Sequence, residues 1–413
     1  ATRATLGAEV RMIGALSLLL PVGCAPEEEP PCGSGTHAED GVCVADEADT
    51  ATDSGGDTDA DTDTDSDTDA DTDADTDADT DTDTWTVCVD GGAPYTDIQD
   101  AVDAAADGDV ISVCPGTYDY VEIRRLDVTL IGAGVELTTI DGGSHTALTV
   151  EDSTFALEGL TLTAEPNVTS TPAGLSLTDC TATIDGVRFA NSGGVGSNWL
   201  AYQYGTDGVW TDLVFEDNEN IGFTAGGGGS VILRHSIFRN NSTTGGLILM
   251  SPDLGDYEVS NNLFYNNALG ERSDGSSFPV SEGTAWVYNN TWWGNDHGGA
   301  QYVVWPESGV IFENNIVAET IGGGIFAYSP VDGIAYNDSY GNTGADWATN
   351  TGNEAPADNI SADPRFNDPE GEDFTLLDGF SPCQDAGDPM SGYDDVDGTR
   401  NDMGAYGGPD GSW

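Results

Sequence analysis

Two stretches decide the fold of this chain: YEVSNNLFY at residues 257–265 and AWVYNNTWW at residues 285–293. Each places an apolar residue, two asparagines and an aromatic residue in the same order, 28 positions apart. An apolar residue followed five positions later by an apolar or aromatic anchor recurs eight times, about every 25 residues. The anchors are Leu162, Phe189, Phe215, Phe238, Phe264, Trp292, Val317 and Tyr340, and the earlier residues are Leu157, Ile184, Trp210, Leu233, Val259, Val287, Phe312 and Ala335.

Two apolar columns separated by polar turns indicate short β-strands, because the repeats contain Gly-Gly pairs and lack a 3.6-residue period. Repeats of this kind stack about 4.8 Å apart and bury one continuous core. We therefore predict an all-β fold, a parallel β-helix of about 9–11 coils. At one turn, stacked side-chain amides are expected to bond from coil to coil as an asparagine ladder. The predicted members of this ladder are Asn261, Asn289, Asn314 and Asn337.

The ends of such a solenoid need a cap, because the last coil exposes strand edges and core. Thr96 and Asp97 can begin a helix that runs to Ala106, with Gly108 after its end. Its apolar face would close the N-terminal end of the solenoid.

Three segments resemble right-handed parallel β-helix proteins with the pectin-lyase-like fold. Residues 95–118, YTDIQDAVDAAADGDVISVCPGTY, resemble the N-terminal cap, and residues 381–388 and 397–406 are similar to the C-terminal segment of bacterial surface β-helix proteins. With the repeats between them, the resemblance covers roughly residues 85–413. It implies a carbohydrate groove along one face, but the superfamily includes lyases, hydrolases, esterases, epimerases and non-enzymatic surface proteins. Fold alone therefore does not assign an activity.

The charge balance excludes several classes of function. The 413 residues contain 74 acidic and 10 basic residues, for a net charge of −64, and every basic residue is Arg. This argues against a nucleic-acid partner, which requires clustered Lys and Arg, and against any mechanism with a catalytic lysine. Anionic polyuronates would be repelled unless calcium bridged the two surfaces.

The N-terminus has the pattern of an export signal. Residues 1–23 carry two arginines and then a short apolar stretch that is too short to span a bilayer. The run Leu20-Pro21-Val22-Gly23-Cys24 resembles a bacterial lipoprotein signal, in which Cys24 is lipidated; ordinary cleavage and secretion is the alternative. The sequence begins at Ala1 and not at Met, so the true start of the chain is open.

A composition change then divides the chain into segments. Residues 24–50 form a short cysteine-containing segment, and residues 51–84 form an Asp/Thr-rich linker that cannot build a core. We interpret this linker as a disordered stalk, with calcium capture or glycosylation of its threonines as alternatives. The β-helix repeats are expected over residues 85–345, and a C-terminal coil and cap over residues 346–413.

Seven cysteines fit an exported chain with one lipidated residue. Cys32 and Cys43 flank a short Gly-containing loop and are expected to pair. A second disulfide is expected between Cys88 and Cys114, at the ends of two short apolar runs. Cys180 and Cys383 have no local partner, and each could be a buried thiol or half of a disulfide.

Candidate catalytic residues cluster around the longest irregular insert. Glu271 and Arg272 lie in residues 269–283, and Asp296 and His297 lie in the next turn. Two carboxylates could serve glycoside hydrolysis, and His297 or Arg272 could move a proton in a lyase. The simpler interpretation is that all four are solvated turn residues. The pectate lyase signature that pairs Asp-His after a Trp, the Arg-rich strand motif of those enzymes and the Gly-His-Gly element of polygalacturonases are absent from the sequence.

Aromatic and acidic residues supply the remaining candidates. Trp199, Tyr202, Trp293 and Trp305 could stack on sugars, although some of these rings are expected in the core. Asp395 and Asp397 have part of a calcium-loop pattern, which makes Ca²⁺ a candidate ligand. The sequence predicts no cofactor with certainty.

From these patterns we predict a monomeric lipoprotein of the bacterial outer membrane or cell surface, or a secreted protein, that binds polysaccharide or another extracellular surface. The only membrane contact expected is the lipid anchor. Two alternatives remain open: a secreted polysaccharide lyase or glycoside hydrolase, and a structural or adhesion protein of the envelope. Convergence of Asp296 and His297 with Glu271 or Arg272 would favour the enzyme.

Overall fold

The computed structural model describes two parts of the chain separately. The described residues are 36–39, 42–45 and 84–413, with gaps at 166–171, 244–246, 251–254, 270–275, 279–283, 299–301, 307–309 and 328–332. The chain divides into units of residues 1–77 and 78–413. In the first unit, strands β1 (Thr36–Glu39) and β2 (Val42–Ala45) pair antiparallel. The predicted signal segment, lipidated Cys24, the linker up to residue 83 and Cys32, the predicted disulfide partner of Cys43, fall outside the described residues.

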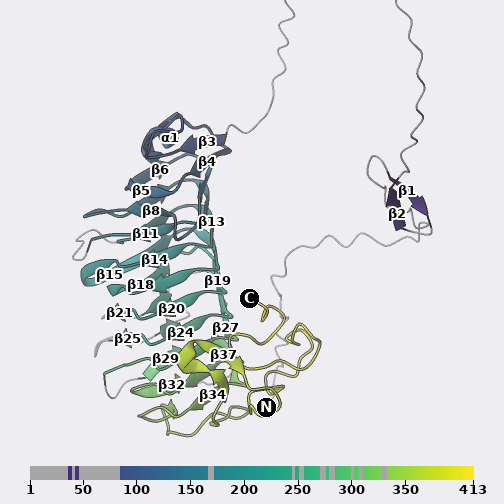
Figure 1. The fold of residues 1–413 in the computed structure, drawn as a ribbon. Helices are drawn as coiled ribbons and strands as arrows, with labels where there is room; N and C mark the ends of the chain where they lie inside the picture. The colour runs from purple at the N-terminus through teal and green to yellow at the C-terminus, as the bar shows by residue number, and fades with distance from the viewer. Residues whose placement is uncertain are drawn as a thin grey trace, which may run out of the picture. The chain divides into compact units, whose positions relative to one another are not determined.

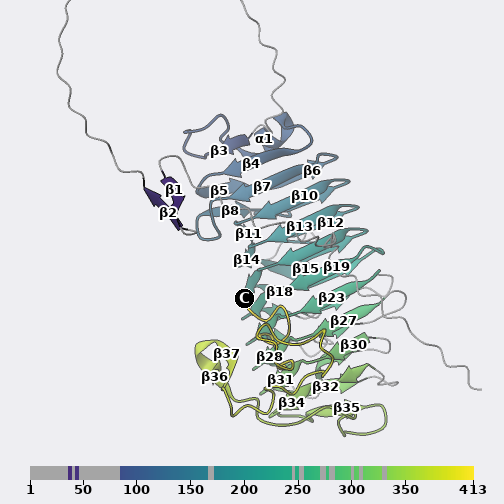
Figure 2. The same ribbon diagram turned by 90° about the vertical axis from the view of Figure 1, so that its right-hand side faces the viewer.

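The second unit is built on a solenoid whose coils contribute strands to three parallel sheets of 11, 10 and 12 strands (Figures 1 and 2). Sheet 1 contains β3 (Thr84–Val87), β4 (Asp109–Val113), β7 (Val128–Gly132), β10 (Thr154–Glu158), β13 (Thr181–Asp185), β16 (Asp207–Thr211), β19 (Val231–Arg234), β23 (Tyr257–Ser260), β27 (Ala285–Tyr288), β30 (Val310–Glu313) and β33 (Ile334–Ala335). Sheet 2 contains β5 (Gly116–Asp119), β8 (Thr138–Asp141), β11 (Thr161–Thr163), β14 (Arg188–Ala190), β17 (Val214–Glu216), β20 (Ile237–Arg239), β24 (Leu263–Tyr265), β28 (Thr291–Trp293), β31 (Ile316–Ala318) and β34 (Asp338–Tyr340).

Sheet 3 completes each coil. It contains β6 (Val121–Arg124), β9 (Leu148–Glu151), β12 (Leu175–Thr178), β15 (Gly193–Tyr204), β18 (Glu219–Gly226), β21 (Ser242–Thr243), β22 (Ile248–Met250), β25 (Ala268–Leu269), β26 (Ser276–Phe278), β29 (Tyr302–Pro306), β32 (Gly323–Ala327) and β35 (Trp347–Thr349). Because the chain passes through sheets 1, 2 and 3 in turn, a given position on one coil lies directly above its equivalent on the next. The predicted all-β solenoid is confirmed.

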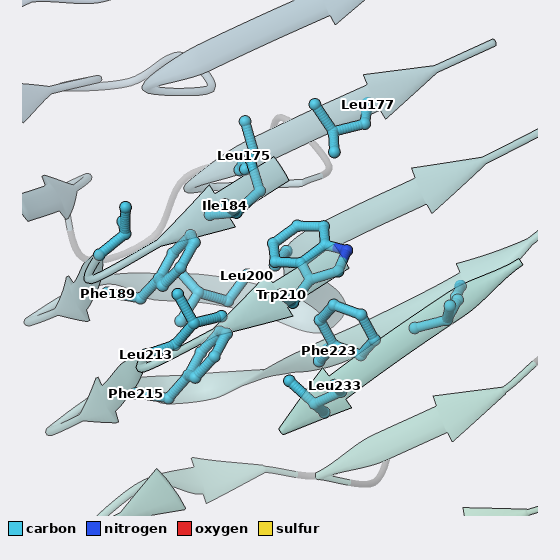
Figure 3. Close-up of a cluster of buried hydrophobic side chains, with 14 of the residues drawn as sticks. Leu175, Leu177, Ile184, Phe189, Leu200, Trp210, Leu213, Phe215, Phe223 and Leu233 are labelled. Carbon is cyan, nitrogen blue, oxygen red and sulfur yellow. The ribbon is translucent and has the colours of Figure 1, made fainter. Parts of the chain in front are cut away.

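The two apolar columns of the sequence form the core of this solenoid. Seven of the eight anchors, from Leu162 to Val317, pair with one another on successive strands of sheet 2. Their rings stack from coil to coil, with centroids 4.5 Å apart for Phe189–Phe215 and 4.3 Å apart for Phe215–Phe238. Figure 3 shows Phe189 and Phe215 in one cluster of buried side chains with Trp210, which belongs to the second column on sheet 1. Burial of these columns is the main stabilising contribution to the fold.

The prediction for the last repeat was wrong by one residue. Val317 pairs with Ser339, and Phe312 pairs with Ile334, so Tyr340 and Ala335 each lie one position past the columns. A serine is tolerated at the buried anchor position because its hydroxyl donates to the Asp346 carbonyl at 2.7 Å. The repeat pattern predicts the aromatic Tyr340 at this position, whereas the structure places Ser339 there, with its hydroxyl hydrogen-bonded.

The asparagine ladder also lies one residue later than predicted in three of its four members. The residues that bond from coil to coil are Asn262, Asn290, Asn315, Asn337 and Asn359. Asn261, Asn289 and Asn314 instead adopt the left-handed conformation, with φ between 51° and 59°, that turns the chain from sheet 1 into sheet 2. Of the predicted members, only Asn337 is in the ladder.

A second ladder, which the sequence analysis missed, follows the turn from sheet 2 to sheet 3. It comprises Asn218, Asn241, Asn267 and Asn295. The amide nitrogen of Asn267 donates to the Asn295 side-chain oxygen at 2.9 Å and to the Phe238 carbonyl at 2.8 Å. Each ladder residue therefore satisfies buried polar groups on two neighbouring coils.

A helix lies where the sequence predicts the N-terminal cap, and it ends at Ala104 instead of Ala106. Helix α1 (Ile98–Ala104) begins after Asp97, whose carboxylate accepts from the Gln99 backbone N–H at 2.8 Å. Ile98, Ala101 and Val102 are buried against the first coils. The predicted disulfide between Cys88 and Cys114 is confirmed and joins the chain segments after β3 and β4.

The C-terminal segment forms a second apolar cluster on the outward face of sheet 2. It contributes the hairpin β36 (Phe366–Asp368), η1 (Pro369–Gly371) and β37 (Asp373–Leu376), followed by irregular chain to residue 413. Phe374 and Met403 pack there against Trp293 and Ile316. Figures 1 and 2 show this yellow segment beside the later coils of the solenoid.

The two cysteines without a local partner are free and buried. The Cys383 thiol donates to the Asp338 carboxylate at 3.3 Å, and burial raises the pKa of Asp338 to about 7. Cys180 lies at the turn from sheet 3 to sheet 1, where its thiol contacts the Thr178 carbonyl at 3.2 Å. Within the described residues, no helix is long and apolar enough to cross a membrane.

Candidate functional site

Outward side chains of sheet 3 bring predicted sugar-stacking residues onto one face. Along β15, Ala201 and Gln203 are buried in the core, whereas Tyr202 is half-buried and Tyr204 is 48% exposed. The register that carries the Tyr202 position across the sheet runs through Thr224, Leu249 and Ser277 to Trp305. Tyr202 and Trp305 therefore share one outward column, separated by four coil steps, or roughly 19 Å.

Three rings gather at the Trp305 end of this column. Trp305 stacks on Phe326 with centroids 4.6 Å apart, and Tyr302 lies 5.3 Å from Phe326. The Trp305 indole N–H donates to the Tyr302 carbonyl at 2.9 Å, which fixes the orientation of the indole ring. A Cβ at Gly323 would collide with the Tyr302 ring, so the absence of a side chain at Gly323 makes room for this ring. We call Tyr302, Trp305 and Phe326 the aromatic group.

Tyr202 and Tyr204 form a smaller pair at the other end of the column. Their rings are stacked with centroids 6.3 Å apart. Gly227 has φ of 76°, and a Cβ there would approach the Tyr204 ring to 2.8 Å. Burial and the neighbouring Tyr204 raise the pKa of Tyr202, so its hydroxyl remains protonated and can donate a hydrogen bond.

The other two predicted stacking residues differ from each other. Trp199 is half-buried on β15, in the same sheet as Tyr202. Trp293 is only 9% exposed, because the C-terminal hairpin covers it and places Phe374 at a centroid distance of 5.7 Å. The prediction that Trp293 meets a sugar is therefore wrong. Phe326 was not among the predicted stacking residues. Its position 21 residues after Trp305, one coil later on sheet 3, could have indicated it.

Of the four predicted catalytic residues, the structure describes two, Asp296 and His297. Asp296 is exposed and accepts from the Gly298 backbone N–H at 2.7 Å, whereas His297 is 1% exposed. The two neighbouring side chains thus lie in different environments. Neither ring nitrogen of His297 has a hydrogen-bond partner among the described residues. Glu271 and Arg272 lie outside those residues.

The candidate calcium loop is held together by its own hydrogen bonds. Asp395 accepts from the backbone N–H groups of Asp402 and Gly408, and Asp397 accepts from Thr399. The side-chain hydroxyl of Thr399 lowers the pKa of Asp397, which is exposed. In the described part of the chain, no three His, Cys, Asp or Glu side chains are grouped to hold a metal ion. Calcium binding by Asp395 and Asp397 stays a prediction.

A pocket of about 720 Å³ lies at the N-terminal end, between α1 and β6. Its lining includes Tyr120, Arg124 and Arg125, none of which was predicted as a site residue. Arg124 pairs with Glu151 at 3.2 Å and Arg125 with Asp152 at 3.6 Å. Because acidic residues pair with both guanidinium groups, the pocket offers little net positive charge to an anion.

Comparisons with known proteins agree with the architecture. Residues 204–361, less than half of the chain, match the family model described as right handed beta helix region. A search of curated proteins finds no match. Pectate lyase Pel9A shares 14% identity over 76% of this chain and 91% of its own, with a TM-score of 0.42.

Two further solved structures are similar at comparable levels. A Paenibacillus alginate lyase shares 15% identity over 62% of this chain and 97% of its own, with a TM-score of 0.26. The Erwinia chrysanthemi pectin methylesterase PemA shares 13% identity over 72% of this chain and 98% of its own, with a TM-score of 0.27. These values are too low to carry an argument about this chain. The family match and the three parallel sheets together identify its repeat region as a right-handed parallel β-helix.

Proposed function

We propose that this protein binds an extended, neutral polysaccharide along the outward face of sheet 3. The observation that carries the proposal is the aromatic group in one outward column with Tyr202. Aromatic faces offer large, rigid contact areas, and the polar ends of Tyr and Trp can hydrogen bond to hydroxyl groups. A polymer that lies across the coils would meet rings at both ends of a span of roughly 19 Å.

Charge supports a neutral ligand over an acidic one. The chain has a net charge of −64, and the arginines near sheet 3 for which contacts are described, Arg124 and Arg125, are paired with acidic residues. A polyuronate would approach against this field, and its affinity would fall further at low ionic strength. A neutral polymer carries no such penalty.

Binding without catalysis is supported by the separation of Asp296 and His297. General acid–base chemistry needs both groups within hydrogen-bonding reach of one reacting bond. An exposed carboxylate and a 1%-exposed imidazole do not provide that arrangement.

We further propose that the protein is a lipoprotein displayed on the bacterial surface. The lipoprotein-like run ending at Cys24 and the acidic stalk after it motivate this localisation. The Cys88–Cys114 disulfide supports export, because such bonds persist in oxidising compartments. Metabolic labelling with a fatty acid tests it: the wild type should be labelled and Cys24→Ser should not. Label retained by Cys24→Ser would contradict lipidation at this residue.

The binding function is tested by affinity electrophoresis of the purified chain in gels with neutral or acidic polysaccharides, with and without calcium. We expect retardation by at least one neutral polymer and none by polyuronates without calcium. Release of reducing ends or unsaturated uronates in parallel reactions would identify an enzyme instead. Absence of both retardation and products would favour the structural or adhesion alternative.

A further inference from the structure

The last part of the chain, residues 384–413, runs back along the corner where sheet 1 turns into sheet 2. We call it the strap. Its contacts fall on the same turn position of successive coils. These contacts are Arg400 over the Tyr336 ring, Asp388 N–H to Asn314, Asn289 to the Asp402 and Gly404 carbonyls, Asn261 to the Ala405 and Gly407 carbonyls, and His235 to the Asp410 carbonyl.

These turn residues are suited to hold the strap because of their backbone conformation. His235, Asn261, Asn289, Asn314 and Tyr336 all have φ between 51° and 59°. Their neighbours in the ladder bond along the solenoid, which leaves the turn side chains to contact the strap. The Asn261 amide, for example, donates at 2.9 Å and 2.8 Å to two strap carbonyls. The strap is thus attached through a series of separate, small contacts.

Acidic groups face one another where the strap crosses β30. Asp388 of the strap donates its backbone N–H to Asn314, the residue after Glu313, at 2.7 Å. Tyr393 of the strap meets Tyr288 edge-on, with ring centroids 6.0 Å apart, and the Tyr288 hydroxyl donates to Glu258 at 2.7 Å. Glu313 is half-buried, pairs in register with Tyr288 of β27, and interacts electrostatically with Asp388, Tyr393 and Tyr336. Glu258 acts in the same way on Tyr393, and Asp358 acts on Tyr336.

Positive charge at this crossing comes from Arg400, which is already engaged. Its Nε donates to the Gly387 carbonyl at 2.7 Å, and its Nη2 donates to the Ala386 carbonyl at 3.1 Å. At the far end of the strap, Arg234 and His235 face Asp410. The carboxyl groups of the crossing thus lack a direct cationic partner among the described contacts.

A carboxylic acid in this environment holds its proton more tightly than in water. Burial, and then the charge of Asp388, raise the pKa of Glu313 to about 7 from an ordinary 4.5. Within the strap, burial raises the pKa of Asp402 to about 6, near Asp395. A raised pKa in the docked state favours docking at low pH, and this preference is lost as the pH rises from about 4.5 through 7.

We propose that the strap is a proton-dependent clasp, docked on the solenoid in mildly acidic solution and loosened at this crossing as the pH rises above neutrality. Loosening would uncover part of the outward face of sheet 2, where Met403 and Ala405 of the strap contact the cluster that contains Trp293. The strap thereby couples proton binding to exposure of an apolar surface.

Hydrogen exchange of the full chain, followed by mass spectrometry at pH 5 and pH 8.5 with EDTA present, tests the proposal. After correction for intrinsic exchange rates, we expect strap amides to exchange about tenfold faster or more at pH 8.5, since raising a pKa by about 1 corresponds to about a tenfold change in an equilibrium constant. Amides of β10 and β13 should show no such change.

Glu313→Gln isolates the group responsible. It mimics the protonated acid, so we expect a protected strap at both pH values, and Asp388→Asn should reduce the pH dependence even if Glu313→Gln folds poorly. Glu158→Gln is the matched control, because Glu158 occupies the same outward column of sheet 1 on a coil far from the crossing. Equal strap exchange at both pH values in the wild type would overturn the proposal. A pH dependence that survives in both Glu313→Gln and Asp388→Asn would assign the effect to His235 or another group and would also overturn the proposal.

Discussion

The outward faces of sheets 2 and 3 both carry aromatic residues, but these residues differ in how far they are buried. Trp293 on sheet 2 is 9% exposed beneath Phe374, whereas Trp305 on sheet 3 is half-buried within the aromatic group. Both strands belong to regular coils of one solenoid. What distinguishes them is the C-terminal segment, which covers sheet 2 and leaves the aromatic column of sheet 3 outside its contacts. One tryptophan therefore belongs to a packed apolar cluster, and the other lies in the column that we propose to bind a polysaccharide.

The largest effect expected from this comparison is on stability. Trp293→Ala removes a ring packed between sheet 2 and the C-terminal hairpin, and we expect a loss of about 3–5 kcal/mol in the free energy of unfolding. Urea denaturation measures this change. A loss below about 1 kcal/mol would mean that the C-terminal segment does not pack on sheet 2 as described.

A smaller effect is expected from the buried Asp338 beneath the same segment. Its pKa of about 7 lies above the ordinary 3.8, so the group favours the folded state below about pH 3.8, and this contribution is lost as the pH rises through 7. We expect the wild type to be less stable at pH 8.5 than at pH 5.5 by about 2 kcal/mol, because each tenfold difference in proton affinity between the folded and unfolded states corresponds to about 1.36 kcal/mol. Asp338→Asn should reduce this difference, and the exposed Asp119→Asn should not. Equal pH profiles for the two variants would contradict the assignment.

The turn between sheets 2 and 3 offers a matched pair of neighbouring asparagines. Asn267→Ala removes a ladder amide and leaves buried groups unsatisfied, which should cost about 1–3 kcal/mol. Asn266→Gly, at an exposed residue with φ of 54°, should change stability by less than about 0.5 kcal/mol. Thermal unfolding compares them. Equal losses would mean that the ladder contributes no more than the turn.

The sequence predicted the fold because its signal is periodic. The spacing of Phe189, Phe215 and Phe238 indicates one buried column whatever the surrounding residues are. The sequence does not show which of Asn261 and Asn262 belongs to the ladder, because both are asparagines. Only the backbone conformation distinguishes the turn residue Asn261 from the ladder residue Asn262. The fate of Trp293 was also hidden, because Phe374 covers it from 81 positions away in the chain.

The residue types of the candidate site could be predicted from the sequence, but their arrangement could not. Tyr202 and Trp305 were found as aromatic residues, but their shared column depends on coil lengths through β18, β22 and β26, which vary from repeat to repeat. Asp296 and His297 are adjacent in the sequence, which alone suggests a common site. In a β-strand or bridge, adjacent side chains point to opposite faces, which explains why one is exposed and the other is buried.

The central claim is that the open aromatic column of sheet 3 binds a neutral polysaccharide, and Trp305→Ala tests it most directly. Titration calorimetry with the polymer that retards the wild type should show affinity weakened about tenfold or more, which corresponds to about 1.4 kcal/mol of binding free energy. Trp286→Ala, which removes a half-buried indole from the outward face of sheet 1, should bind as the wild type does. Unchanged affinity of a folded Trp305→Ala, or an equal loss in Trp286→Ala, would contradict the account.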